Sequence, residues 1–300
     1  MRTGRSPQQS NVDMVPRMPS WVTRARAETL EDVAFSSGAA LNHLHVVLVD
    51  PSVPHALLRE RLALSAAEAC VAFSGRSERA ADLRDAIHLL RPGDLPGPAG
   101  ETYQGWRGAV ERPVSVSALQ RALPGCAAPQ IAVWLDRQNM RAATQGSPVG
   151  RASRVLEAVL ADMPRAEVPA LILADAALAQ ALGWDHLVPL LATGLKRADL
   201  RKRGDDLRLA CHRAVIASVI DAVRLAADLA RRTAHLTAVA PQLRASRARD
   251  AIEMFLTQDA VAPAALPLPD RAARRLCDRL VDLGAIRELT GRDTFRLYGV

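Results

Sequence analysis

The segment that most constrains the fold is a long periodic stretch from Asp205 to about Val239. Its apolar residues recur at helical spacing on one stripe, and a further apolar group covers much of a second face. A helix that is apolar on more than one face lies at the centre of a protein or between two domains. We therefore expect a helix over 205–239 that connects a helical body to the C-terminal part of the chain. The two apolar groups are Leu207, Ala210, Cys211, Ala214, Ser218, Ala222, Leu225, Leu229 and Leu236, and Ile216, Val219, Ile220 and Val223.

The composition favours helices in the rest of the chain as well. Apolar residues make up 49% of the 300 residues, whereas aromatic residues make up only 3%. Leu and Ala dominate and β-branched residues are sparse, which favours helices over strands. Proline and glycine separate the expected helices. We place these helices near 27–49, 54–74, 77–90, 101–111, 115–123, 128–143, 150–162, 167–182, 205–239, 243–257 and 271–283.

These elements predict an all-α fold in two parts. A multi-helix bundle forms the body over residues 21–240 and includes the long helix, and a small winged helix-turn-helix with a two-stranded wing follows over 241–300. Residues 1–20 have no apolar core like that of a secretory signal, so we expect a disordered tail there. No apolar run reaches the roughly 18–20 uncharged residues of a membrane span, so no membrane insertion is predicted.

The positive charge is distributed unevenly along the chain. Residues 1–195 carry 19 basic and 19 acidic side chains, whereas residues 196–300 carry 20 basic and 13 acidic side chains, a net charge of +7. Such an asymmetry indicates a polyanionic partner, with nucleic acid first and an anionic membrane second. A solvated basic surface is the alternative interpretation.

The four cysteines, Cys70, Cys126, Cys211 and Cys277, are far apart and never form a Cys-x-x-Cys pair. This spacing argues against a zinc ribbon or a redox pair, and most of these residues have apolar neighbours, as small core residues do. We predict no metal site and no cofactor, and we expect a reducing, cytoplasmic location.

The chain ends with "DRAARRLCDRLVDLGAIRELTGRDTFRLYGV", in which a basic helix is expected first. Asp270 is the expected N-cap and Gly284 the expected stop signal. An apolar stripe faces inward, and Arg271, Arg274 and Arg275 project away from it. Their charge lies on the N-terminal half of the helix, where free N–H groups already attract anions.

A hairpin is expected next, with Gly291 in the turn and Arg292 near the tip. Helix, helix, basic helix and hairpin is the element order of a winged helix-turn-helix, whose last helix enters the major groove of DNA. The sequence therefore predicts a cytoplasmic DNA-binding, regulatory protein. The predicted DNA-binding residues are Arg271, Arg274, Arg275 and Arg292, with Arg244, Arg247 and Arg249 as an additional phosphate-binding edge.

A winged helix-turn-helix has three helices, and the sequence gives little support for the second one, because "PAALPLP" leaves room for one turn at most. Winged helices also serve as dimerisation or protein-docking modules. The second hypothesis is therefore a helical interaction protein or scaffold, with a homodimer or protein partner on the body and a purely structural tail. It predicts that Arg271, Arg274 and Arg275 are paired with carboxylates of the same chain.

The C-terminal stretch resembles the winged-helix tail that follows the catalytic body of many Fic-type proteins. Three segments together, "RDAIHLLRPGDLPGPAG", "LADAALAQALGWDHLVPLLA" and the terminal stretch, are similar to an alpha-proteobacterial family, domain of unknown function 1403. This resemblance covers nearly the whole chain and implies a bacterial, often plasmid-borne setting, but no activity.

No enzymatic activity is predicted. The stretch "HLVPLLATGLKR" lacks the Gly-Asn-Gly that Fic catalysis needs, so a Fic-related enzyme is the less favoured alternative. Asp85 and His88 lie three residues apart on one helix, and Asp94 follows in the loop "RPGDLPGPAG". An acid–histidine group of this kind is capable of acid–base chemistry, but an ion-paired helix end is the more frequent arrangement.

Overall fold

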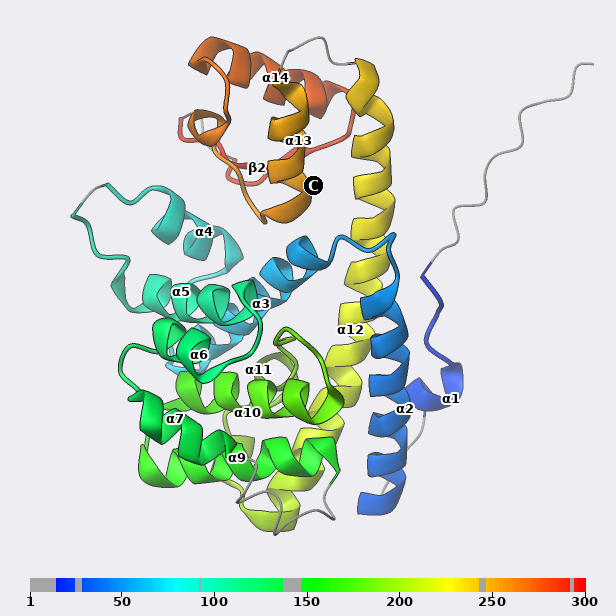
Figure 1. The fold of residues 1–300 in the computed structure, drawn as a ribbon, viewed down its shortest axis with the longest axis vertical. Helices are drawn as coiled ribbons and strands as arrows, with labels where there is room; N and C mark the ends of the chain where they lie inside the picture. The colour runs from blue at the N-terminus through cyan, green and yellow to red at the C-terminus, as the bar shows by residue number, and fades with distance from the viewer. Residues whose placement is uncertain (1–14, 25–28, 92, 137–146, 243–246, 292–293) are drawn as a thin grey trace, which may run out of the picture.

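The computed structural model describes residues 15–24, 29–91, 93–136, 147–242, 247–291 and 294–300. The protein is mainly α-helical, and α12 (Gly204–Val239) follows its long axis (Figure 1). With 36 residues, α12 is about 54 Å long at 1.5 Å per residue. The helix predicted over 205–239 is confirmed to within one residue.

The body is built from helices that pack on α12 and on one another. α2 (Leu30–Val49) lies along α12, α3 (His55–Phe73) packs against α5 (Gly97–Glu111), and α9 (Pro148–Asp162) packs against α10 (Glu167–Leu182). These pairs enclose a single continuous apolar core. The shorter elements of the body are α1 (Ser20–Arg24), α4 (Ala80–His88), α6 (Val116–Ala122), α7 (Ala128–Leu135), α11 (Leu191–Gly194) and the 3₁₀ turn η1 (Asp199–Arg201).

The short α11 packs against both α10 and α12, and a buried acid lies close to its start. The side-chain oxygens of Asp175, on α10, accept backbone N–H groups of Leu190 at 3.1 Å and Leu191 at 3.2 Å. At Gly194 a Cβ atom would lie 2.6 Å from the Cα of Ala214 on α12, so only glycine permits this approach. Asp175 therefore holds the start of α11, and Gly194 lets α11 contact α12.

Most helices predicted from the sequence are present, with small differences at their ends. The predicted helix 128–143 is wrong at its end, because α7 stops at Leu135 and Asp136 is extended, with ψ of 125°. Residues 137–143 lie outside the described residues. α5 begins at Gly97 rather than at residue 101, since Pro98 falls in the first turn, where proline is tolerated.

The first 20 residues, predicted to be a disordered tail, are described only from Val15 onward. Val15 is buried in the core, and the carbonyl oxygen of Pro16 lies 2.8 Å from Nε2 of His43 on α2. None of the described helices is long and apolar enough to cross a membrane.

Candidate nucleic-acid interface

The last part of the chain, residues 247–300, forms a helix-and-hairpin assembly that we call the C-terminal unit. It contains α13 (Ala248–Thr257), the one-turn η3 (Pro263–Ala265), α14 (Asp270–Asp282), β1 (Arg287–Glu288) and β2 (Tyr298–Gly299). β1 and β2 are antiparallel, and Val261 pairs with Tyr298 on the other edge of β2 through N–H···O bonds of 2.8 and 2.9 Å. The segment between α13 and η3 therefore joins the hairpin.

The start of α14 differs from the expectation. Asp270 is the first helical residue and Pro269 is the N-cap, so the prediction that Asp270 caps the helix is wrong. The carbonyl oxygen of Pro269 accepts the N–H groups of Ala272 and Ala273, and the Asp270 carboxylate pairs with Arg274 instead, at 3.1 Å. The predicted stop at Gly284 is present, with φ of +66°.

The outer face of α14 is uncovered. Arg271, Arg274 and Arg275 are all exposed there, and Nε of Arg275 donates to the carbonyl oxygen of Arg271 at 3.3 Å. The sequence analysis missed Arg279, which is exposed one turn further along. Its spacing of four residues from Arg275 was the available signal. Asp278 and Asp282 are exposed as well, so the helix surface mixes four arginines with aspartates.

The remaining predicted residues fall near the start of the unit or outside the described residues. Arg247 and Arg249 are exposed at the N-terminal end of α13. Arg244 and Arg292 lie outside the part of the chain that the structure describes. The structure thus brings Arg271, Arg274 and Arg275 onto one helix and places Arg247 and Arg249 on another.

A buried acid fixes the C-terminal unit to the body. Asp259, just after α13, is 1% exposed and forms ion pairs with Arg61 of α3 and Arg84 of α4. Arg84 binds both carboxylate oxygens, with Nε–Oδ2 of 2.5 Å and Nη2–Oδ1 of 3.0 Å. Arg61 also donates to the backbone carbonyl oxygens of Asp259 at 3.3 Å and Val300 at 3.0 Å.

Both guanidinium groups remain charged in this contact. Burial lowers the pKa of Arg61. Burial acts in the same direction on Arg84, but the hydrogen bonds and charge of Asp259 outweigh it and raise the pKa of Arg84. Because the ordinary arginine pKa lies above about 12, neither shift neutralises the side chain. The contact is therefore a buried ion triad, which ties the beginning and the end of the hairpin assembly to α3 and α4.

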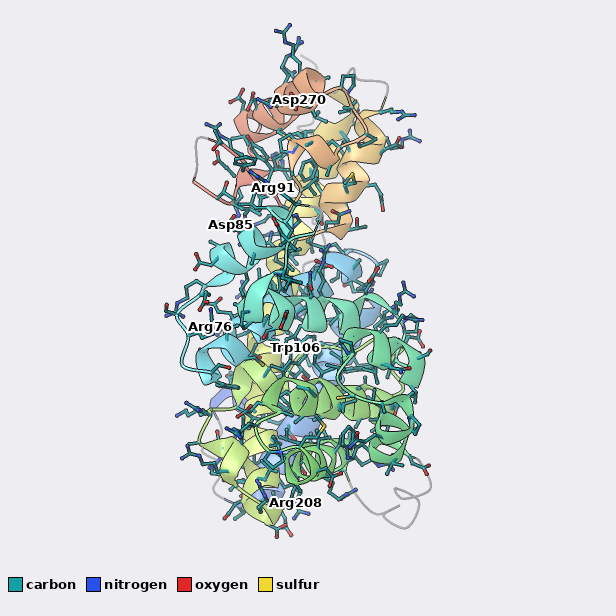
Figure 2. All side chains as sticks on the ribbon, turned by 90° about the vertical axis from the view of Figure 1, so that its left-hand side faces the viewer. Arg76, Asp85, Arg91, Trp106, Arg208 and Asp270 are labelled. Carbon is teal, nitrogen blue, oxygen red and sulfur yellow. The ribbon has the colours of Figure 1, made fainter. Side chains whose placement is uncertain are left out.

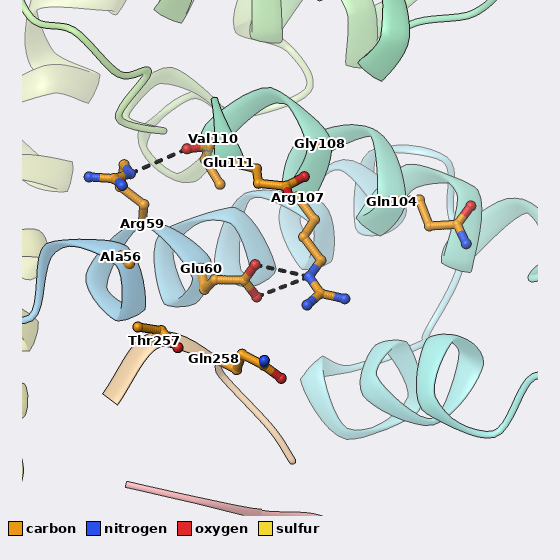
Figure 3. Close-up of a pocket in the computed structure, with 10 residues that line it drawn as sticks. All are labelled: Ala56, Arg59, Glu60, Gln104, Arg107, Gly108, Val110, Glu111, Thr257 and Gln258. Atoms are coloured by element: carbon orange, nitrogen blue, oxygen red, sulfur yellow. Dashed lines mark hydrogen bonds and ion pairs between the residues drawn. The ribbon is translucent and has the colours of Figure 1, made fainter. Parts of the chain in front are cut away.

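A hollow of about 490 Å³ opens beside this contact, between α3, α5 and the end of α13 (Figure 3). Glu60 and Arg107 face each other across it, with Nε–Oε1 of 2.9 Å, and Arg59 donates to the carbonyl oxygen of Val110 at 3.2 Å. Burial raises the pKa of Glu60, and Arg107 opposes this effect. Positive and negative groups line the hollow in equal number, so it has no strong preference for either charge.

The predicted acid–histidine group consists of Asp85 and His88 on α4 and Asp94 in the loop that follows, and these residues differ in their surroundings. Burial lowers the pKa of His88, and Arg107 acts in the same direction. Asp94 accepts the backbone N–H of Arg91 at 2.9 Å, as part of the loop after α4. Asp85 and Arg91 lie in the upper part of the molecule, between Asp270 at the top and Arg76 (Figure 2). Within the described residues, no three His, Cys, Asp or Glu side chains are grouped so that they could hold a metal ion.

The fold also divides the basic third of the sequence. Residues 196–240, which form η1, α12 and the turn before them, carry ten basic and five acidic side chains, whereas residues 241–300 carry ten basic and eight acidic side chains. Most of the net charge is therefore in the body. The exposed basic residues of the turn before α12, which we call the basic turn, are Lys196, Arg197, Arg201, Lys202 and Arg203.

The fold and the exposed arginines define a mainly helical protein whose last helix has an exposed, arginine-bearing face. Residues 6–300 match the family described as "Protein of unknown function (DUF1403)". The chain belongs to this family, and the resemblance drawn from the sequence is confirmed to that extent. A search of curated proteins finds no match.

Proposed function

We propose that the protein binds DNA through the C-terminal unit, which we assign as a winged helix-turn-helix. The order α13, η3, α14 and hairpin supports this assignment, as does the pairing of Val261 with the second hairpin strand. In such a unit the last helix enters the major groove, and its N-terminal residues contact bases and phosphates.

One observation carries the proposal: Arg271, Arg274, Arg275 and Arg279 are all exposed on α14. Among the described residues, Arg274 forms an ion pair with the exposed Asp270 of its own helix alone, at 3.1 Å. An exposed pair of this kind contributes about 0–1 kcal/mol, so phosphate can displace the carboxylate at little cost. The aspartates of the same face lower the non-specific attraction to DNA, which favours a reader of base edges over a purely electrostatic binder.

The first experiment is a fluorescence anisotropy titration of the full chain with labelled duplex DNA over a range of salt concentrations. We expect binding that weakens steeply with salt. The variant Arg271→Ala/Arg275→Ala should bind at least about tenfold more weakly, since each lost contact to a charged group is worth about 1 kcal/mol or more.

A charge-matched control, Arg213→Ala/Arg224→Ala, removes two exposed arginines of α12. It should bind DNA as the wild type does. If both variants lose DNA affinity equally, the loss reflects the total positive charge of the protein rather than contacts of α14. The assignment of α14 as the DNA-contacting helix would then be withdrawn.

A helical interaction protein is the second candidate. An exposed aromatic pair on the body favours it: Trp21 of α1 and Phe35 of α2 stack with ring centroids 5.7 Å apart, and the two residues are 52% and 70% exposed. Exposed aromatic residues are enriched where proteins bind one another. Light scattering of the wild type and of Trp21→Ser/Phe35→Ser tests for self-association, with a larger mass expected only for the wild type.

A further inference from the structure

A second hollow lies in the body, far from the C-terminal unit, where four parts of the chain meet. Its volume is about 250 Å³, and α2, the start of α9, the end of α10 and α12 contribute to its walls. The lining residues are Ala34, Ser37, Gly38, Leu41, Asn42, His45, Ser147, Pro148, Val149, Leu182, Trp184 and His212.

The described residues that line the hollow combine apolar groups with a few polar ones and include no lysine, arginine, aspartate or glutamate. Trp184 is held in place because its Nε1–H donates to Nδ1 of His45 at 3.1 Å. Gly38 leaves part of the hollow open, since a Cβ atom at this residue would meet no atom within 4 Å. A neutral molecule with a flat apolar body suits such walls, because aromatic rings stack on one another and charged groups find no partner.

One buried polar group lines the hollow with an unused nitrogen. His212 is 2% exposed, and its Nδ1 lies 2.6 Å from Oγ of the buried Ser37. The other ring nitrogen, Nε2, forms no hydrogen bond within the part of the chain that the structure describes. An imidazole nitrogen of a residue that lines a hollow, with no partner among these residues, can accept a hydrogen bond from a ligand that enters the hollow.

The hydrogen-bond network sets the character of this nitrogen. Ser37 has one hydroxyl proton, and its Oγ donates to the carbonyl oxygen of Ala34 at 2.9 Å. The Nδ1–H of His212 then donates to the same Oγ, and Nε2 is left as an acceptor; this tautomer is assigned from the network. Burial lowers the pKa of His212 to about 4, and Arg208 acts in the same direction, so the ring is neutral near pH 7.

We propose that this hollow binds a small neutral aromatic molecule with one N–H or O–H group, which donates to Nε2 of His212. The apolar walls hold the ring of the ligand, and the single acceptor orients it. Binding pockets for small molecules commonly have this composition, with few polar groups that fix orientation. The site is separate from α14 and does not depend on DNA binding.

The test is a titration of the full chain, labelled with ¹⁵N at histidine, with indole and separately with phenol. The Nε2 resonance of His212 should shift and saturate as it accepts a hydrogen bond, while Nδ1 remains protonated. The variant Gly38→Leu places a side chain in the hollow, where its Cβ meets no atom within 4 Å. It should bind at least about tenfold more weakly, because the added side chain takes up space that the ligand needs. Circular dichroism checks that this variant remains folded.

The matched control is Val49→Leu, an exposed enlargement on the same helix outside the hollow. It should bind as the wild type does. The absence of a saturable shift with both probes, binding that leaves the Nε2 resonance unmoved, or affinity unchanged by Gly38→Leu would each overturn the proposal.

Discussion

The arginines that hold the C-terminal unit and the arginines that it displays differ in their surroundings. Arg61 and Arg84 are buried and share the buried carboxylate of Asp259, whereas Arg271 and Arg275 are exposed and form no ion pair within the described residues. A buried guanidinium without its acid is an uncompensated charge, while an exposed one is solvated by water. The same residue type therefore fixes the unit at one surface and remains available for a ligand at another.

The largest expected effect comes from removing the shared acid. Asp259→Ala leaves Arg61 and Arg84 buried without a partner and should lower the free energy of unfolding by about 3–5 kcal/mol. Urea unfolding followed by circular dichroism measures this change.

The matched control is Asp228→Ala, because Asp228 also pairs with two arginines, Arg231 at 2.9 Å and Arg232 at 2.8 Å, but at the surface. Its loss should cost less than about 1 kcal/mol. If Asp259→Ala and Asp228→Ala lower the free energy of unfolding equally, burial does not make the ion pairs of Asp259 stronger contributors to stability than those of Asp228.

A pH-dependent effect follows from the other buried acid, Asp175, which has backbone N–H groups as partners rather than an arginine. Burial raises its pKa from 3.8 to about 8, although the N–H groups of Leu190 and Leu191 act in the opposite direction. The folded state therefore binds a proton that the unfolded chain releases. Its contribution to stability is fully present below about pH 4 and is lost as the pH rises to about 8.

Asp175→Asn removes this titration and keeps an acceptor for the backbone. The difference in unfolding free energy, wild type minus variant, should therefore fall between about pH 5 and about pH 8, by about 1.4 kcal/mol for each unit of pKa difference that is traversed. Urea unfolding at both pH values provides the measurement. A difference that does not change with pH would contradict a protonated Asp175.

The smallest expected effect on stability is that of the exposed set. Arg271→Ala/Arg275→Ala should change the free energy of unfolding by no more than about 0.5 kcal/mol per residue, because neither guanidinium is buried or paired with an acid in the described structure. A loss comparable to that of Asp259→Ala would show that these arginines are structural, as the interaction-protein hypothesis requires.

Periodicity was sufficient to predict most of the longer helices, but not the short α1 and α11 or the end of α7. The helix 167–182 agrees with α10 at both ends, and α12 differs by one residue, because apolar spacing and the terminal glycine are local signals. The weak middle helix is likewise visible in the sequence, since η3 has only three residues. Proline and short apolar runs affect the backbone within a few residues, so their effect on helix length can be predicted without knowing the tertiary contacts.

The contacts of Asp259 and His212 could not be predicted in the same way. Asp259 contacts Arg61, which is 198 residues away in the sequence, and His212 contacts Ser37, which is 175 residues away. No local pattern marks such partners, because they are set by how α3 and α2 pack in the folded chain. The count of charges also could not show where the positive charge lies in the fold. It places the excess in the last third of the sequence, and most of that excess belongs to α12 and the basic turn rather than to the C-terminal unit.

The basic turn is the other exposed basic surface that could bind DNA. The decisive measurement therefore compares the basic turn with α14. It is the salt dependence of DNA binding by Arg271→Ala/Arg275→Ala and by Arg197→Ala/Arg201→Ala, each against the wild type. At a slope of about 0.9 per phosphate contact, the first variant should lose about 1.8 from the slope of log K against log salt, and the second should retain the wild-type slope. A reduced slope in the second variant alone, or no DNA binding by the wild type at low salt, would contradict the assignment of α14 as the DNA-binding surface.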